Sequence, residues 1–403
     1  MNHSITRRPY HLRGALKEFA WGMDDPHCWV SMLCAFVGSP GPFAEVWFGD
    51  HEKGSASIEV SRGQFMSVRE ICARHPELLF DIERPLRKIP FQGKLLCVGA
   101  PLSIQLHPKK EDAVRLHRKT PGEYPDEEPK NEAGIAVSTV ELLYGFRPID
   151  RIFGAIDFNP EFKELLGAVG TRARLEAMAN PEQYLRDVCM AILEADDETV
   201  ERCSEQLYDR LADFVGDGLS PEEIWVLKMK EFYPKGDRGL FYFFVLNLVT
   251  LQPGQSLAIP VGRLHAYLSG QLIEIMQSGD DVIRVAMTTK FKDPDEVLAC
   301  GEFESIDPAA LIGGGTFAKD ARRIYQFPPF EFAVESFEDP GEFTIQPSDC
   351  PQLFVSLGGV ADLATAASET LAIVRSEAAL FPAASHPGKL IVKSGRLICF
   401  RMQ

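Results

Sequence analysis

Short apolar runs separated by glycine and proline fill residues 1–150, and Trp, Phe and Val are enriched in them. Runs of this length between turn-forming residues predict strands joined by tight turns and long loops. Strand character returns at Leu240 and continues to Met402, with turn signals at Pro253-Gly254 and Gly313-Gly314-Gly315. Both ends of the chain are therefore predicted to be built from β-strands.

The stretch from about residue 158 to residue 233 follows the helical period instead. Apolar residues recur on one helix face at Leu185, Val188, Cys189 and Ile192. Ser220-Pro221 predicts a helix start, because a capping residue is followed by proline at the first helical position. Strands, then helices, then strands predict a β-barrel protein interrupted by a helical insertion.

Length and charge limit the classes of partner. The chain has 403 residues, more than one hydrophobic core usually organises, so we expect two or three domains. The 58 acidic and 42 basic side chains give a formal net charge of −16. Such a surface repels nucleic acid and anionic lipid at long range, so we expect neither as a partner.

Cysteine usage and hydropathy predict a cytoplasmic protein. The nine cysteines are scattered and form no C-x-x-C pair, which is typical of reduced thiols in a cytosolic chain. No stretch approaches the roughly 18 consecutive apolar residues of a membrane span. The first eight residues are not followed by the apolar region of a signal peptide.

Polar residues alternate along the segment 101–108. Because successive side chains of a strand point to opposite faces, Ser103, Gln105 and His107 share one face. Buried polar groups must be paired, so a barrel lumen that holds a metal or a polar ligand would explain this face. The alternative is an edge strand with its polar face in water.

Further charged residues lie within apolar strand patterns. Glu132 precedes small residues that a crowded lumen would accept, although a surface carboxylate has the same pattern. His265 and Tyr267 alternate onto one face after a Pro-Gly turn. Glu274 and Arg284 each lie between apolar neighbours on their strand face. Since buried charges are usually paired, a structural Glu274–Arg284 ion pair is the plainest interpretation.

A Gln-x-His pair, a glutamate and a distant histidine together offer four nitrogen and oxygen donors. This set suits zinc with at least one open position. Because glutamate would be the only anionic ligand, the site would keep a net positive charge. Such a charge stabilises an enediolate or polarises a sugar carbonyl.

Several ungapped motifs resemble one known family when they are taken in order. The matching stretches are Phe43–Gly54, Leu102–Pro108, Tyr124–Glu132, Gly145–Pro148, His265–Gly270 and Asp280–Arg284. In this order the chain resembles type I mannose-6-phosphate isomerases (phosphomannose isomerases). The resemblance covers roughly residues 20–300, and the last 80 or so residues contribute little to it.

The resemblance implies a mainly β fold of cupin-type jelly-roll barrels (a bicupin) with an inserted α-helical domain. Residues 1–150 and 236–320 would form the catalytic metal-binding jelly-roll domain. Residues 151–235 would form the helical domain, and residues 321–403 a C-terminal cupin-like β domain.

The same resemblance implies one zinc ion per chain. Its ligands would be Gln105, His107, Glu132 and His265. The candidate catalytic residues are Arg284, Lys130, Glu274 and Tyr267, and the candidate substrate contacts are Lys94, Ser103 and Lys109. One departure is visible, because this chain has Pro129-Lys130-Asn131-Glu132 where the family usually reads His-Lys-Pro-Glu. The lysine and the glutamate are kept, and we expect the loop to differ in shape from that of other family members.

The implied reaction interconverts mannose 6-phosphate and fructose 6-phosphate through a cis-enediol, and it needs a base and a stabiliser for the oxyanion. Glu274, Lys130 and a metal-organised water are alternative bases. Lys94, Lys130, Arg284 and the pair Lys109-Lys110 are cations available to the phosphate, although Lys109-Lys110 also has the pattern of a solvated helix start. We expect a monomer whose only partner is a small sugar phosphate.

Two other functions fit parts of the pattern. A non-catalytic sugar-phosphate-binding cupin would have the same fold, but the ligand set and Arg284 are all present. A metal-dependent cupin oxygenase would usually use a His-x-His pair, whereas the first position here is Gln105.

Overall fold

A computed structural model describes residues 7–34, 40–81, 86–214, 218–383 and 387–403. Within these residues the protein is mainly β, with one 10-stranded and one 11-stranded antiparallel sheet. The 10-stranded sheet contains β2 (Ala15–Lys17), β3 (Glu45–Phe48), β6 (Phe91–Val98), β7 (Ile104–Leu106), β8 (Glu132–Ala136), β9 (Val140–Phe146), β10 (Leu246–Leu251), β11 (Ser256–Ile259), β12 (His265–Gln277) and β13 (Ile283–Ala286).

The second sheet joins strands from both ends of the chain. It contains β1 (Tyr10–Arg13), β4 (Ser57–Ser61), β5 (Gln64–Ser67), β14 (Thr316–Phe317), β15 (Arg323–Gln326), β16 (Phe332–Phe337), β17 (Gly341–Ile345), β18 (Gln352–Ala364), β19 (Thr370–Ile373), β20 (Ala378–Phe381) and β21 (Gly388–Met402). Strand β1 pairs with β20 on one side and with β4 on the other. The second sheet therefore combines strands from the first 70 residues with strands from the last 90 or so.

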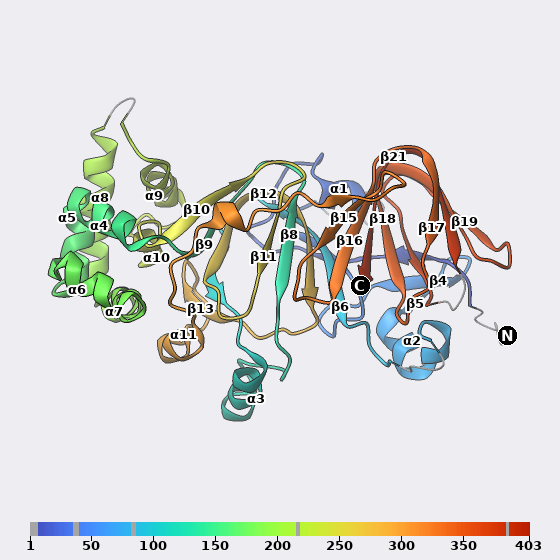
Figure 1. Ribbon diagram of the computed structural model, residues 1–403, viewed down its shortest axis with the longest axis horizontal. Coiled ribbons are helices and arrows are strands. Elements are labelled where there is room, and N and C mark those ends of the chain that lie inside the picture. The colour runs from blue at the N-terminus through green and yellow to red at the C-terminus, as the bar shows by residue number, and fades with distance from the viewer. Residues whose placement is uncertain (1–6, 35–39, 82–85, 215–217, 384–386) are drawn as a thin grey trace.

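Helices between the two long β segments gather at one end of the molecule, beyond strand β9 and the edge strand β10 (Figure 1). They are α4 (Ile149–Phe158), α5 (Pro160–Leu166), α6 (Arg174–Ala179), α7 (Pro181–Glu194), α8 (Asp197–Ala212), α9 (Pro221–Phe232) and α10 (Gly239–Tyr242). The helical run is thus longer at both ends than the predicted 158–233. The predicted start at Ser220 is confirmed, since its side chain and that of Glu223 form a reciprocal capping box.

The strand predicted from Leu240 is wrong. Helix α10 occupies Gly239–Tyr242, and the strand β10 begins only at Leu246. The whole run from Leu240 to Leu246 is buried, and a continuous apolar run cannot by itself distinguish a buried strand from a buried helix. The described residues also contain α1 (Trp29–Cys34), α2 (Val68–Arg74), α3 (Lys110–Lys119) and α11 (Pro294–Cys300) outside this group.

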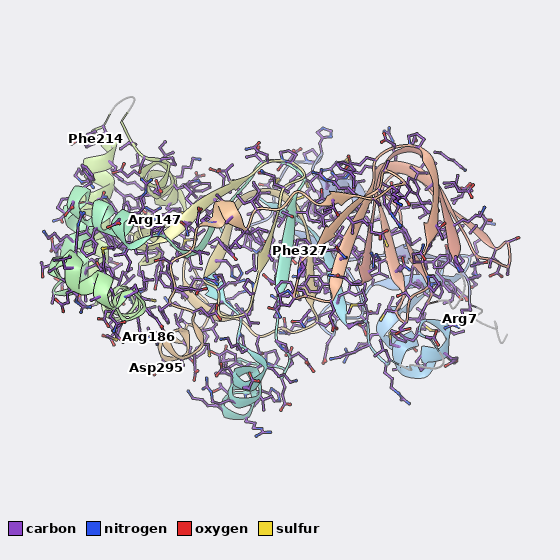
Figure 2. The ribbon with its side chains drawn as sticks, viewed as in Figure 1. Arg7, Arg147, Arg186, Phe214, Asp295 and Phe327 are labelled. Atoms are coloured by element: carbon purple, nitrogen blue, oxygen red, sulfur yellow. The ribbon has the colours of Figure 1, made fainter. Side chains whose placement is uncertain are left out.

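One hydrophobic core lies between the two sheets. From the 10-stranded sheet it receives alternate residues such as Leu95 and Ile273, and from the other sheet Leu353 and Phe400. Phe327, labelled near the centre of Figure 2, belongs to the same core. The residues between these on β6 and β12 therefore point to the other face of the 10-stranded sheet.

In the part of the chain that the structure describes, every helix is too short or too polar to cross a membrane.

Candidate metal centre

Strand register builds a polar row on the face of the 10-stranded sheet that points away from the shared core. Lys94 on β6 lies opposite Glu274 on β12, and Glu274 lies opposite Gly134 on β8. Directly paired residues of an antiparallel ladder point to the same face. Glu132, two residues before Gly134, also points to this face.

Three side chains from distant segments converge beside this row. His107 Nε2 lies 3.3 Å from Glu132 Oε1, and His265 Nε2 lies 3.4 Å from Glu132 Oε2. One possible ligand atom of each residue lies within 4.8 Å of the others. His107, Glu132 and His265 are only 0%, 2% and 1% exposed. The predicted alternation of polar residues therefore faces the protein interior, and the edge-strand and surface-carboxylate interpretations are wrong.

Backbone carbonyls set the tautomer of both histidines. His107 Nδ1 is 2.8 Å from the carbonyl oxygen of Asp281, and His265 Nδ1 is 2.9 Å from that of Arg263. A carbonyl only accepts hydrogen bonds, so both Nδ1 atoms must carry the proton. Each Nε2 then has a free lone pair, and neither has a hydrogen-bond partner among the described residues. Two buried, unpartnered imidazole nitrogens on either side of a carboxylate fit a divalent cation such as zinc.

The glutamine before His107 lies next to the same cluster. Gln105 is paired with His265 across β7 and β12, and with Arg284 across β7 and β13. The Ser103 hydroxyl donates to Gln105 Oε1 at 3.2 Å. The amide is thus placed beside the histidines and is oriented by a neighbour on its own strand face.

Charged neighbours keep the cluster in a form that can bind a cation. Burial disfavours ionisation of Glu132, yet the charge of Lys130 holds the pKa of this carboxyl well below its usual range. Lys130 Nζ lies 2.8 Å from Glu132 Oε1. Burial, followed by the charge of Lys130, lowers the pKa of His107 to about 4. The imidazole is therefore neutral near pH 7.

The buried Lys94 bridges two carboxylates. Its Nζ lies 2.9 Å from Glu274 Oε2 and 3.9 Å from Glu45 Oε2. Burial opposes the charge of Lys94, but Glu274 and Glu45 together raise its pKa above the ordinary lysine value. Burial raises the pKa of Glu274, and Lys94 partly offsets this effect. The predicted Glu274–Arg284 ion pair is wrong, because β12 pairs with β6 and brings Lys94 to Glu274.

Tyr267 enters the same polar row. Burial, and then the nearby charge of Glu274, raise the pKa of its phenol well above the usual value. A Cβ atom at Gly134 would lie only 2.8 Å from Tyr267 Oη. Glycine at position 134 therefore leaves the room that the tyrosine hydroxyl needs beside Glu274.

The three remaining cations, Arg284, Lys109 and Lys110, differ in their surroundings. Arg284 is half-buried, and burial lowers the pKa of its guanidinium. No hydrogen bond or ion pair links this guanidinium to another residue of the described ranges. Lys109 caps α3, is half exposed and lies 3.1 Å from Glu302 Oε1. Lys110 begins α3 and pairs with Glu128 at 3.2 Å, so this stretch is a solvated helix start.

Sequence reasoning gave no role to several residues next to this row. Trp47 has Lys94 Nζ 5.1 Å from its ring, and its Nε1 donates to Glu45. The His51 ring meets Trp47 edge-on at 5.0 Å and helps to line a hollow of about 310 Å³ together with Asp280. The available signal was Glu45 and Trp47 alternating in an otherwise apolar strand, the same pattern as Gln105 and His107.

Comparisons with known proteins show what this chain is similar to. Residues 10–149 match the family model of the phosphomannose isomerase type I catalytic domain. The chain is 30% identical over 355 residues to mannose-6-phosphate isomerase of Rattus norvegicus, covering 84% of each chain. It is 32% identical over 301 residues to that of Mus musculus, covering 71% of each.

Solved structures show the same fold. A phosphomannose isomerase structure from Salmonella typhimurium superposes with a TM-score of 0.83 at 24% identity, covering 98% of this chain and 99% of that one. A zinc-bound mannose 6-phosphate isomerase gives a TM-score of 0.81 at 24% identity, covering 98% and 100%.

Proposed function

The chain belongs to the type I mannose-6-phosphate isomerase family, and from this membership we propose that it is a zinc-dependent isomerase of mannose 6-phosphate and fructose 6-phosphate. The observation that carries the proposal is that His107, Glu132 and His265 converge on one buried point. The Nε2 atoms of the two histidines have no hydrogen-bond partner there among the described residues. A sugar-phosphate substrate and a zinc cofactor are stated in the names of family members and of a structural neighbour.

We propose that one zinc ion per chain is held by His107, Glu132, His265 and Gln105. The donor set is two neutral nitrogens, one carboxylate and one amide oxygen, which suits zinc with an open coordination position. When bound, zinc supplies a Lewis acid that polarises sugar oxygens and offsets developing negative charge. Lys130, 2.8 Å from Glu132, keeps that carboxyl ionised and ready to bind.

Glu274 is the side chain we propose to move the proton between the two reacting carbons. A general base works best when its pKa lies close to the working pH, and burial raises the pKa of Glu274 in that direction. Lys94 Nζ lies 2.9 Å from Glu274 Oε2 and fixes the position of the carboxylate. The Tyr267 hydroxyl lies in the same row and would orient the sugar by donating a hydrogen bond.

Arg284 is the cation we propose for the substrate. Its guanidinium is permanently charged and is not used by another described residue, whereas Lys94 and Lys130 already neutralise carboxylates. Ser103 donates a hydrogen bond to Gln105, the residue that Arg284 lies opposite in the sheet. The sequence predicts that Lys109 contacts substrate. Its ion pair with Glu302 at the surface favours a structural role instead.

The finer description of the protein is also a proposal. The two sheets would be cupin-type jelly-roll barrels, and α4 to α10 an inserted helical domain. The expected boundaries are residues 1–150 with 236–320, 151–235 and 321–403. We also propose a cytoplasmic monomer, and the net charge of −16 argues against nucleic-acid partners.

A coupled assay for fructose 6-phosphate formed from mannose 6-phosphate tests the proposed activity directly. The purified protein should turn over the substrate and contain close to one equivalent of zinc by elemental analysis. Glu274→Gln should keep the zinc and lose most of kcat, since the amide cannot take the proton. Full activity in protein that contains no divalent metal would contradict the proposed site.

A further inference from the structure

The turn at residues 260–264 contacts each segment that carries a candidate zinc ligand. It leads directly into His265, whose Nδ1 donates to the carbonyl oxygen of Arg263 at 2.9 Å. The amide of Gly262 donates to the carbonyl oxygen of His107 at 2.7 Å. Two histidines that are far apart in sequence are therefore joined through this short piece of backbone.

Asn131 ties the same turn to the third ligand. Its Oδ1 accepts a hydrogen bond from the Val261 amide at 3.0 Å. Its Nδ2 and its own amide donate to Gln277 Oε1 at 2.7 and 3.2 Å. Its carbonyl accepts from the Gln277 amide at 2.9 Å. The residue immediately before Glu132 is thus fixed from both sides, and its amide donor and side-chain acceptor are groups that proline lacks.

Glu302 braces the turn from the outer side. Its amide donates to the carbonyl oxygen of Gly262 at 3.0 Å. Its two carboxylate oxygens lie 3.1 Å from Lys109 Nζ and 3.3 Å from Arg263 Nη2. Lys109 follows the first candidate histidine by two residues, and Arg263 precedes the second by two. One carboxylate therefore bridges the chain segments that present both imidazoles.

The close packing of this brace requires glycine in the turn. Gly262 has φ +79°, and a Cβ there would lie 2.8 Å from Glu302 Cγ. Glu302 therefore packs directly against the turn, and Asn131 is joined to the same turn by its hydrogen bond to Val261.

We propose that Asn131 and Glu302 are positioning residues, which hold His107, Glu132 and His265 at zinc-binding distances through the turn 260–264. This inference rests on the proposed zinc site and adds residues that do not touch the metal. Polar partners that orient metal ligands typically change metal affinity about 10- to 100-fold when they are removed. Each residue fixes the ligands indirectly, so we expect losses of about 10-fold, near the lower end of that range.

The experiment measures the zinc dissociation constant of the full chain by competition with a chromogenic chelator. Asn131→Ala and Glu302→Gln are each expected to raise this constant about 10-fold. Glu304→Gln is the matched control for the second variant, because Glu304 contacts Arg263 at 2.8 Å but is not paired with Lys109. Ser278→Ala is the control for the first, since its hydroxyl donates to the Ile89 carbonyl and not to the turn.

Thermal unfolding of each protein with and without zinc separates positioning from general destabilisation. A positioning role leaves the melting temperature of the zinc-free protein close to that of the wild type and reduces the increase that zinc produces. If both variants bind zinc within about twofold of the wild type, or lose affinity no more than their controls, the inference is overturned while the isomerase proposal stands. A wild-type protein that binds no zinc would instead overturn the proposed site itself.

Discussion

Replacing Lys94 with methionine tests how the buried charge of Glu274 is maintained. The two charged groups are 2.9 Å apart, and their side chains are only 7% and 3% exposed. Two unit charges at this separation attract each other by roughly 6 kcal/mol at an effective dielectric constant of about 20. Methionine keeps the aliphatic volume and removes the charge, so Glu274 stays buried without its nearest cation.

Proton uptake by Glu274 limits the resulting loss of stability. Keeping a carboxyl of ordinary pKa, about 4.3, neutral at pH 7 costs about 3–4 kcal/mol at 1.36 kcal/mol per pKa unit. Breaking a buried ion pair on one side costs a similar amount, about 3–5 kcal/mol. In the variant the folded-state pKa of Glu274 rises further above its unfolded value, because the charge of Lys94 no longer offsets burial. The folded state then binds the extra proton, and stability falls as pH rises between the two pKa values.

Urea unfolding at pH 7 and pH 5 measures how much lower the free energy of unfolding of zinc-saturated Lys94→Met is than that of the wild type. We expect this deficit to shrink by about 1.4 kcal/mol for each pH unit of acidification. The double variant Lys94→Met/Glu274→Gln should recover most of the loss, because the nearest carboxylate partner of Lys94 is then neutral and Glu45 keeps its hydrogen bond from Trp47 Nε1. A deficit below about 1 kcal/mol at pH 7, or one that is equal at both pH values, would refute the reasoning.

Three further substitutions probe the site. His107→Ala should lose both zinc, measured by elemental analysis, and turnover; a variant that keeps one equivalent of zinc would show that His107 is not a ligand. Arg284→Ala should retain zinc while kcat falls by orders of magnitude, and an almost unchanged kcat would remove Arg284 from the chemistry. Gly134→Ala should lower thermal stability by about 1–3 kcal/mol through overpacking, because its Cβ would lie 2.8 Å from the Tyr267 hydroxyl. The helical Gly154→Ala, which meets no atom within 4 Å, is the control and should be tolerated; equal effects of both would contradict the packing argument.

Local periodicity explains why part of this site is readable from the sequence. The side chains of a strand alternate, so Gln105 and His107 must share a face whatever lies opposite them. The same rule places Glu132 and Gly134 together. These deductions need no knowledge of partners, and the structure confirms the interior position of His107 and Glu132. Helix starts such as Ser220 are equally local, because the capping groups are four residues or fewer apart.

Pairing between distant strands explains the errors. Glu274 and Arg284 have similar apolar neighbours, so an ion pair between them looks plausible from the pattern alone. The register of β12 against β6 places Lys94 opposite Glu274 instead, and register is set by long-range contacts. For the same reason strands β1, β4 and β5, although early in the chain, belong with the C-terminal strands.

Some of the groups that orient the candidate ligands belong to the backbone, and a pattern of side chains does not predict them. The tautomers of His107 and His265 are set by the carbonyl oxygens of Asp281 and Arg263, which any residue could supply. A motif therefore identifies the ligands but not the scaffold that orients them. Asn131 is informative in this respect, because its side-chain Oδ1 accepts from the Val261 amide in the turn before His265, while its own amide donates to Gln277 and fixes the chain beside Glu132. A change of residue type beside a retained ligand can thus alter how firmly the ligand is held without altering which ligand it is.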